Sequence, residues 1–250
     1  MERGAEPVVL VPGLASDARI FAPQIVALSA GRAVQVGHVA EDSTIEAMAR
    51  SVLADAPPRF ALAGHSMGGF VALEIVRQAP ERVARLALLA SDCMADAPAV
   101  AAAREELIVA ARAGRLGEAM RRAMPPEALA PGEGRAGLHE AIVRMAQDLG
   151  PEVFVRHMRA LQRRSDQERT LRSLRIPTLI LGGRHDRLCP PRRQEFMATM
   201  AWTARLVLLE EAGHAPTLET PEAVTQALAA WLDRQAPLVL RRAAPAAAAT

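Results

Sequence analysis

The segment Gly64-His65-Ser66-Met67-Gly68-Gly69 constrains the fold more than any other part of the chain. It follows a short apolar run, residues 60–63, and precedes a helical pattern of apolar residues, 70–79, that Pro80 ends. This order predicts a strand, a sharp turn and a helix, with Ser66 at the turn. Glycines two positions before and after the serine let strand and helix approach closely, because glycine has no Cβ. The turn therefore presents the Ser66 hydroxyl at the carboxyl end of a predicted sheet.

Two later strands are each followed by a residue that could assist this serine. Residues 178–181 predict a buried strand, and Gly183-Arg184-His185-Asp186 follows it. Residues 205–209 predict another strand, and Gly213-His214 follows that one. The order of serine, acid and histidine along the chain is typical of a nucleophile with its orienting acid and its base.

Strands and helices alternate through most of the chain. The predicted strands lie near residues 7–11, 33–38, 60–63, 83–90, 178–181 and 205–209. Helices are expected between them, one opened by the capping-box spacing of Ser43 to Glu46, so the pattern predicts a parallel sheet covered on both faces. Between residues 95 and 171 the alternation gives way to about four or five helices rich in Ala, Arg, Met and Glu. A final helix is expected from Thr220-Pro221 to about residue 235.

With these motifs the chain resembles the α/β-hydrolase family, and within it the small serine esterases and lactonases. The resemblance spans roughly residues 7–235 and rests on Leu10-Val11-Pro12-Gly13, the Ser66 turn, the segments ending at Asp186 and His214, and Glu219-Thr220-Pro221-Glu222. It implies an α/β-hydrolase fold, with a mostly parallel sheet of about six strands, helices on both faces and a helical cap.

The resemblance also implies a spatial order and a domain division. The second strand should lie at one edge, followed by the first, third, fourth, fifth and sixth. Only seven residues precede Val8, so we expect the family's usual antiparallel hairpin to be absent. Residues 1–94 and 172–235 are predicted to form the hydrolase core, residues 95–171 the cap and residues 236–250 a flexible tail.

The predicted catalytic residues are Ser66, His214 and Asp186. Ser66 is the predicted nucleophile, because a serine hydroxyl attacks only when a base takes its proton. His214 is the predicted base, and Asp186 is expected to hold its ring in the correct tautomer. Asp92 also follows a strand and stays open as an alternative acid. The resemblance assigns the oxyanion hole to the backbone amides of Leu14 and Met67.

Substrate specificity is expected to lie in the cap and beside the catalytic segments. The predicted pocket residues are Cys93, Leu188, His157 and Met158. A stripe that includes Met158 runs along the helix predicted at residues 151–164, and core packing is the favoured interpretation of it. Three arginines on the same helix could hold a substrate carboxylate, although a solvated face is favoured for them: Arg156, Arg159 and Arg163.

Composition excludes several other chemistries. A formal net charge of +2 gives no basis for nucleic-acid or membrane partners, and no apolar run approaches the ~18 residues of a membrane helix. Because the chain contains no lysine, Schiff-base and P-loop chemistry are excluded. The histidines and the two cysteines lack metal-site spacing, so no metal and no cofactor are expected. We expect a cytoplasmic location, while the oligomeric state stays open.

These observations predict a serine hydrolase that cleaves small carboxylic esters or lactones through an acyl-enzyme intermediate, with a small-molecule ester as its partner. Two alternatives remain open at this point. A perhydrolase or cofactor-free haloperoxidase would use the same three residues. A non-catalytic ligand receptor on the same fold could also retain them.

Overall fold

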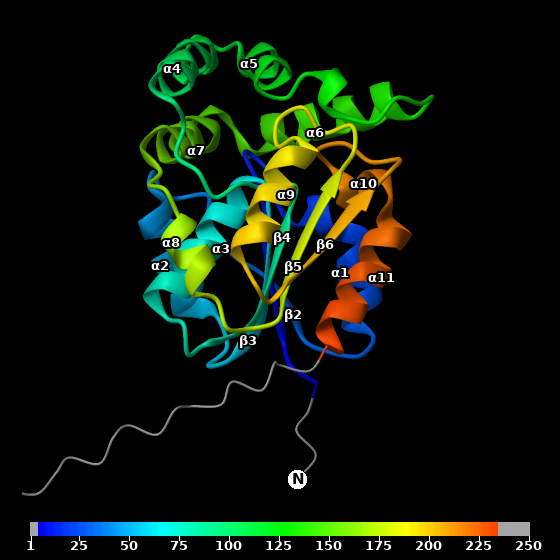
Figure 1. Ribbon diagram of the computed structural model, residues 1–250. Coiled ribbons are helices and arrows are strands. Elements are labelled where there is room, and N and C mark those ends of the chain that lie inside the picture. Colours follow the sequence, from blue (N-terminus) through cyan, green and yellow to red (C-terminus); the bar gives the residue numbers. More distant parts are fainter. Residues whose placement is uncertain (1–4, 235–250) are drawn as a thin grey trace, which may run out of the picture.

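The computed structural model describes residues 5–234, which contain a parallel sheet of six strands in the order β2-β1-β3-β4-β5-β6 (Figure 1). The expected strand order and the expected number of strands are both confirmed. The predicted tail, residues 236–250, lies outside the described residues. The strand bounds are β1 Val8–Val11, β2 Val34–Val36, β3 Phe60–His65, β4 Val83–Leu89, β5 Thr178–Gly183 and β6 Ala204–Leu209.

Alternate residues of each strand pack against different helical layers. Val8 and Leu10 belong to the core on one face, which α1 (Ala22–Ser29) and α11 (Pro221–Leu232) cover. Val9 and Val11 belong to the core on the other face. That second face is covered by α2 (Ile45–Asp55), α3 (Met67–Gln78), α8 (Glu168–Ser173) and α9 (Pro191–Met200). Because strand side chains alternate between faces, strands that are apolar throughout can serve both layers.

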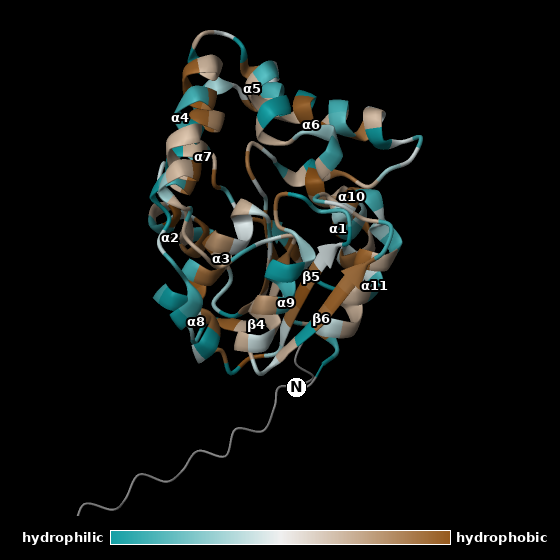
Figure 2. Cartoon of the chain, turned by 45° about the horizontal axis from the view of Figure 1, so that its top comes forward, coloured by the Kyte–Doolittle hydropathy of each residue, from teal (hydrophilic) through white to brown (hydrophobic). Residues whose placement is uncertain are grey.

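A further group of helices lies over the carboxyl ends of the strands (Figure 1). It comprises α4 (Pro98–Arg112), α5 (Leu116–Ala123), α6 (Arg135–Leu149) and α7 (Pro151–Arg163). Its buried residues Met120, Ile142 and Phe154 belong to the same apolar cluster as Leu10 of β1. Figure 2 shows the apolar strands β5 and β6 in brown, with teal hydrophilic segments on the surrounding helices. These helices are therefore anchored to the sheet by shared core packing.

The turns near the predicted site are tighter than the sequence pattern indicates. The predicted strand 60–63 and helix 70–79 are both longer in the structure, so that β3 ends at His65 and α3 begins at Met67.

Three short helical segments were not predicted: η1 (Ala18–Phe21), η2 (Pro126–Ala128) and α10 (Pro216–Glu219). Each is four residues or fewer, too short to show a helical period in sequence.

Candidate active site

Ser66 occupies a strained one-residue turn between β3 and α3. Its φ of 52° and ψ of −116° lie in a region that non-glycine residues rarely adopt. A Cβ on Gly64 would lie 2.2 Å from the carbonyl oxygen of Gly68, and one on Gly68 would lie 2.1 Å from that of Val11. Both glycines are thus required by close backbone approach, as the spacing predicts, and the turn holds the serine side chain at the carboxyl edge of the sheet.

Ser66, His214 and Asp186 form a continuous hydrogen-bonded chain. His214 Nε2 lies 2.9 Å from Ser66 Oγ, and His214 Nδ1 lies 2.9 Å from Asp186 Oδ2. Since a carboxylate only accepts, Nδ1 carries the ring proton and Nε2 is left to accept the serine hydroxyl. The other oxygen of Asp186 accepts the amides of Leu188 and Cys189 at 2.8 and 2.9 Å. The acid is therefore held rigidly, and with it the orientation of the ring.

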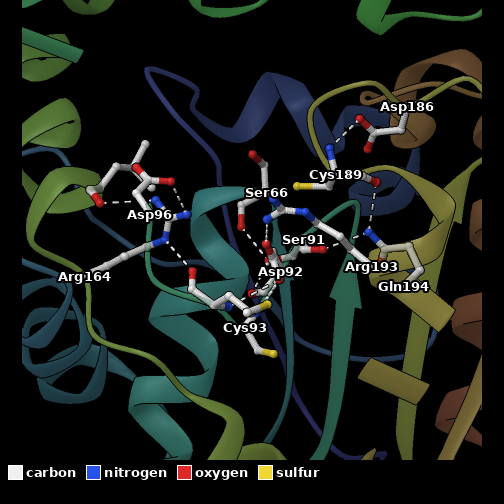
Figure 3. Close-up of polar contacts among 12 residues, drawn as sticks. Ser66, Ser91, Asp92, Cys93, Asp96, Arg164, Asp186, Cys189, Arg193 and Gln194 are labelled. Atoms are coloured by element: carbon white, nitrogen blue, oxygen red, sulfur yellow. Dashed lines mark hydrogen bonds and ion pairs between the residues drawn. The ribbon is translucent and has the colours of Figure 1, made fainter. Parts of the chain in front are cut away.

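Asp92, the alternative acid, is committed elsewhere. One carboxylate oxygen accepts the backbone amide of Cys93 at 2.7 Å and that of Met94 at 3.3 Å. The other oxygen is paired with the guanidinium of Arg193 (Figure 3). The structure thus brings Asp186, and not Asp92, to His214.

Two side chains fix the loop that carries His214. The buried His65 ring donates from Nε2 to the His214 carbonyl oxygen at 2.8 Å. Burial, followed by the neighbouring His214, lowers the pKa of His65 to about 4, so this ring is neutral. Glu219 accepts three backbone amides, those of Ala130, Gly213 and Ala215, at 2.7 to 2.9 Å. The motif at Glu219 is visible in the sequence, but its role as an acceptor of backbone amides was not predicted. Its position five residues after His214 was the one feature that could have indicated this role.

The two amides predicted for the oxyanion hole come from residues that line one cavity with Ser66: Leu14 in the loop after β1 and Met67 at the start of α3. Met67 begins α3, so its N–H has no partner within the helix. The Leu14 amide has no acceptor among residues 5–234. The next residue, Ala15, has a φ of 43° and donates its amide to His157 Nδ1 at 3.0 Å. The Leu14 and Met67 amides are therefore left without a backbone acceptor in the described part of the chain, as the predicted oxyanion hole requires.

His157 is therefore a support for this loop and not a wall of the pocket, contrary to the sequence prediction. Its ring is fully buried, and Nε2–H donates to the carbonyl oxygen of Val39 at 2.9 Å. Burial lowers the pKa of His157 to about 4. A neutral ring that bridges Ala15 and Val39 joins α7 to the segments that follow β1 and β2.

A cavity of about 370 Å³ opens at Ser66. Leu188 lines it as predicted, together with Leu14, Met67 and His214. Part of its apolar wall comes from η1, α5 and α6 and their flanks, and the rest includes residues of α3, α4 and α7: Ile20, Met120, Ala123, Met124 and Ile142, with Phe70, Val100 and Leu161. A volume in this range suits a small ligand held mainly by apolar contacts.

Cys93 and Met158, like His157, do not line the cavity, which corrects the prediction for both. Cys93 is fully buried in the core on the α2–α3 face of the sheet, and burial raises the pKa of its thiol to about 12. Met158 is buried in the opposite core. The remaining histidine near the site, His185, is exposed and lies outside this cavity. Cys93 and His185 thus adjoin catalytic segments in sequence without lining the cavity.

The fold also assembles three atoms of metal-ligand type that no sequence spacing indicates. The ligand atoms of Asp186, Cys189 and His214 lie within 4.8 Å of one another. Asp186 and His214 are already bonded to each other, and burial raises the pKa of the Cys189 thiol. A protonated thiol is a weak ligand, so these residues fit hydrogen bonding better than metal binding.

A parallel sheet with a serine, histidine and acid at its carboxyl edge defines the class of α/β enzymes that carry a nucleophile on a strand–helix turn. The chain belongs to the alpha/beta hydrolase family, whose model matches residues 8–227. It is therefore an enzyme, a hydrolase. Among residues 5–234, no helix has the length and apolar character needed to cross a membrane.

Comparison with known proteins agrees with this assignment. A pimeloyl-[acyl-carrier protein] methyl ester esterase of Aromatoleum aromaticum is 31% identical over 199 residues, covering 74% of this chain and 79% of that protein. A thermophilic esterase from Thermogutta terrifontis superposes with a TM-score of 0.83 at 28% identity, covering 92% and 90% of the two chains. The enol-lactonase of Burkholderia xenovorans LB400 shares the fold, with a TM-score of 0.78, 24% identity and 93% of each chain covered.

Proposed function

We propose that this protein is a serine hydrolase that cleaves small carboxylic esters or lactones through an acyl-enzyme intermediate. The observation that carries the proposal is the hydrogen bond from Ser66 to His214, 2.9 Å long, at the mouth of a largely apolar cavity. The similarity to proteins named as esterases supports an ester as the bond that is cleaved. The small carboxylic ester or lactone is the partner that this proposal implies.

In the proposed mechanism Ser66 Oγ attacks the ester carbonyl carbon while His214 Nε2 takes the hydroxyl proton. Asp186 stabilises the imidazolium that forms. The carbonyl oxygen becomes an anion and accepts hydrogen bonds from the amides of Leu14 and Met67, each worth roughly 3 kcal/mol in the transition state. The imidazolium then returns its proton to the leaving alkoxide as the C–O bond breaks, which leaves the acyl group on Ser66. Water, activated by His214, releases the acid by the same steps.

We further propose that residues 95–171 act as a cap over this site. Met120, Met124 and Ile142 come from that segment and contribute to the cavity wall. Substitutions in α5 and α6 should therefore change the preference of the enzyme for acyl-chain length. The helix α8, at the end of the segment, packs on the α3 side of the sheet.

The proposal is tested with p-nitrophenyl acetate and the variant Ser66→Ala. Removal of a triad serine costs on the order of a millionfold in turnover. Wild-type protein should also gain the mass of a serine-directed fluorophosphonate, and the variant should not. Normal turnover by a folded Ser66→Ala protein would overturn the assignment of the nucleophile. Ser91→Ala is a suitable control. The Ser91 hydroxyl donates to the Ser66 carbonyl oxygen at 2.8 Å and should not react with the fluorophosphonate, so this variant should be labelled like the wild type.

A further inference from the structure

The cavity wall carries more positive than negative side chains. Four guanidinium groups line it against two carboxylates: Arg104, Arg164, Arg187 and Arg193, with Asp92 and Asp96. The chain as a whole has a formal net charge of only +2. The cationic groups are therefore concentrated where a substrate would bind.

Both carboxylates are fully engaged. The two oxygens of Asp96 accept one hydrogen bond each, from Arg104 Nε and Arg164 Nη2, both at 2.6 Å. The two oxygens of Asp92 are taken by backbone amides and by Arg193, as described above. The two acids are thus paired with three of the four arginines, and four positive against two negative groups leave the wall with an excess of two positive charges.

The four arginines differ in how many donors they leave for a ligand. The Arg104 side chain is only 20% exposed and uses two of its nitrogens on Asp96 and the Met158 sulfur. Arg164 is buried and spends its remaining nitrogens on the carbonyl oxygens of Met94 and Leu161, so it is structural. Arg193, by contrast, uses a single nitrogen on Asp92, and its side chain is 41% exposed. Arg187 is exposed and makes no ion pair or hydrogen bond within residues 5–234. A guanidinium carries five N–H donors, so Arg187 and Arg193, which both line the cavity, keep most of theirs unpaired within residues 5–234.

Both arginines are linked to segments that carry the reacting groups. Asp92, the partner of Arg193, follows Ser91, whose hydroxyl donates to the Ser66 carbonyl oxygen at 2.8 Å (Figure 3). Arg187 follows Asp186, whose carboxylate holds His214. Apolar residues from η1, α5 and α6 line the same cavity. The cavity thus combines apolar groups with guanidinium groups that can bind an anion.

We propose that Arg193 and Arg187 form a subsite for a carboxylate carried by the substrate, a few bonds from the scissile carbonyl. This inference rests on the proposed ester-cleaving function and narrows its substrate class to half-esters of short dicarboxylic acids and lactones that bear a free carboxylate. The planar fork of an arginine matches the two oxygens of a carboxylate, which a neutral ester group would not use.

The test compares two esters of the same shape, monomethyl glutarate and its neutral primary amide, methyl 5-amino-5-oxopentanoate. Hydrolysis is measured with the wild-type protein, and binding is measured by ligand-detected NMR with Ser66→Ala. A charge-assisted hydrogen bond should give the carboxylate an advantage of about tenfold in kcat/KM and in affinity at low salt. The advantage should shrink as salt is added, because the site is open to solvent.

Variants then locate the preference. Arg187→Gln removes one cation, and the double variant Asp92→Asn with Arg193→Gln removes the second without leaving a buried charge unpaired. Each should bring the carboxylate-to-amide ratio closer to one. Arg184→Gln is the matched control, because Arg184 pairs with Glu210 outside the cavity, and its ratio should equal that of the wild type. The ratio is internal to each variant, so a partial loss of folded protein cancels.

Equal affinity for the two esters would overturn the subsite, as would a preference that both arginine variants retain. The proposed function fails separately. If the wild type hydrolysed neither ester while Ser66→Ala still preferred the carboxylate and lost that preference in the arginine variants, the subsite would stand and the esterase would not.

Discussion

Replacing His157 by glutamine should make folding less sensitive to acid. The His157 ring is fully buried between the amide of Ala15 and the carbonyl oxygen of Val39. Burial lowers its pKa from 6.5 to about 4. Between these two values the unfolded chain binds a proton at this ring and the folded chain does not. The free energy of unfolding must therefore fall as the pH falls through this window.

The magnitude follows from the two pKa values. The interval from 6.5 to about 4, at about 1.4 kcal/mol for each pH unit, corresponds to a total loss of about 3 kcal/mol, reached only when the folded chain is protonated as well. Between pH 7 and pH 5 about 2 kcal/mol of this is lost. His65, also buried with a pKa of about 4, should lose a similar amount. The wild type should thus lose about 4 kcal/mol from these two rings over that range.

Glutamine does not titrate and retains a donor and an acceptor for the two backbone groups. His157→Gln should be less stable at pH 7, by an amount on the order of 1–3 kcal/mol for imperfect hydrogen bonds. Its further loss between pH 7 and pH 5 should be about 2 kcal/mol smaller than that of the wild type. Urea unfolding followed by tryptophan fluorescence at pH 7, 6 and 5 measures both quantities.

His38→Gln serves as the control, because the His38 side chain is 59% exposed. It should keep the wild-type dependence on pH. An unchanged dependence in His157→Gln would show that the ring is not held neutral by burial, and the explanation of the loop after β1 would fail with it. A parallel drop in kcat for His157→Gln would support the role of that loop in the oxyanion hole.

Three further predictions concern the turn, the acid and metals. Asp186→Asn should lower kcat by about 10⁴-fold at neutral pH, because the imidazole is then held in the wrong tautomer; Asp92→Asn should lower it far less, and the reverse result in steady-state assays would move the acid to β4. Gly68→Ala should destabilise the fold by roughly 3 kcal/mol or more in urea unfolding, since the new Cβ would lie 2.1 Å from a backbone oxygen. Gly137 lies in α6, and a Cβ added there would meet no atom within 4 Å. Gly137→Ala should therefore stabilise the fold by up to about 1 kcal/mol, and equal effects of the two changes would refute the packing argument. EDTA should leave ester hydrolysis unchanged, because the proposed mechanism uses only side chains and backbone amides; a loss that one defined metal reverses would contradict it.

The sheet and the three proposed catalytic residues were predictable because their signals are local. Each of Ser66, Asp186 and His214 follows the end of a parallel strand, and such ends meet at one edge of a sheet whatever the details of packing. The glycines around Ser66 were predictable for a similar reason, since the close approach of β3 and α3 depends on residues within the same turn. The expected strand order also agrees with the structure.

The cavity wall was decided by tertiary packing. Sequence periodicity correctly placed Met158 on an apolar face of α7, but it does not state which way that face turns; the helix docks with Met158 in the core and His157 against the loop after β1. A solvated face was the favoured interpretation of the arginines on the same helix, and Arg159 indeed pairs with Glu105 outside the cavity. The cavity takes Arg193 from α9 and Arg187 from the β5 loop, which are separated in sequence from the Asp92 that pairs with Arg193. Local patterns determine which residues end a strand or share a helix face, whereas the direction of each face depends on contacts between segments far apart in the chain, and those exist only in the folded molecule.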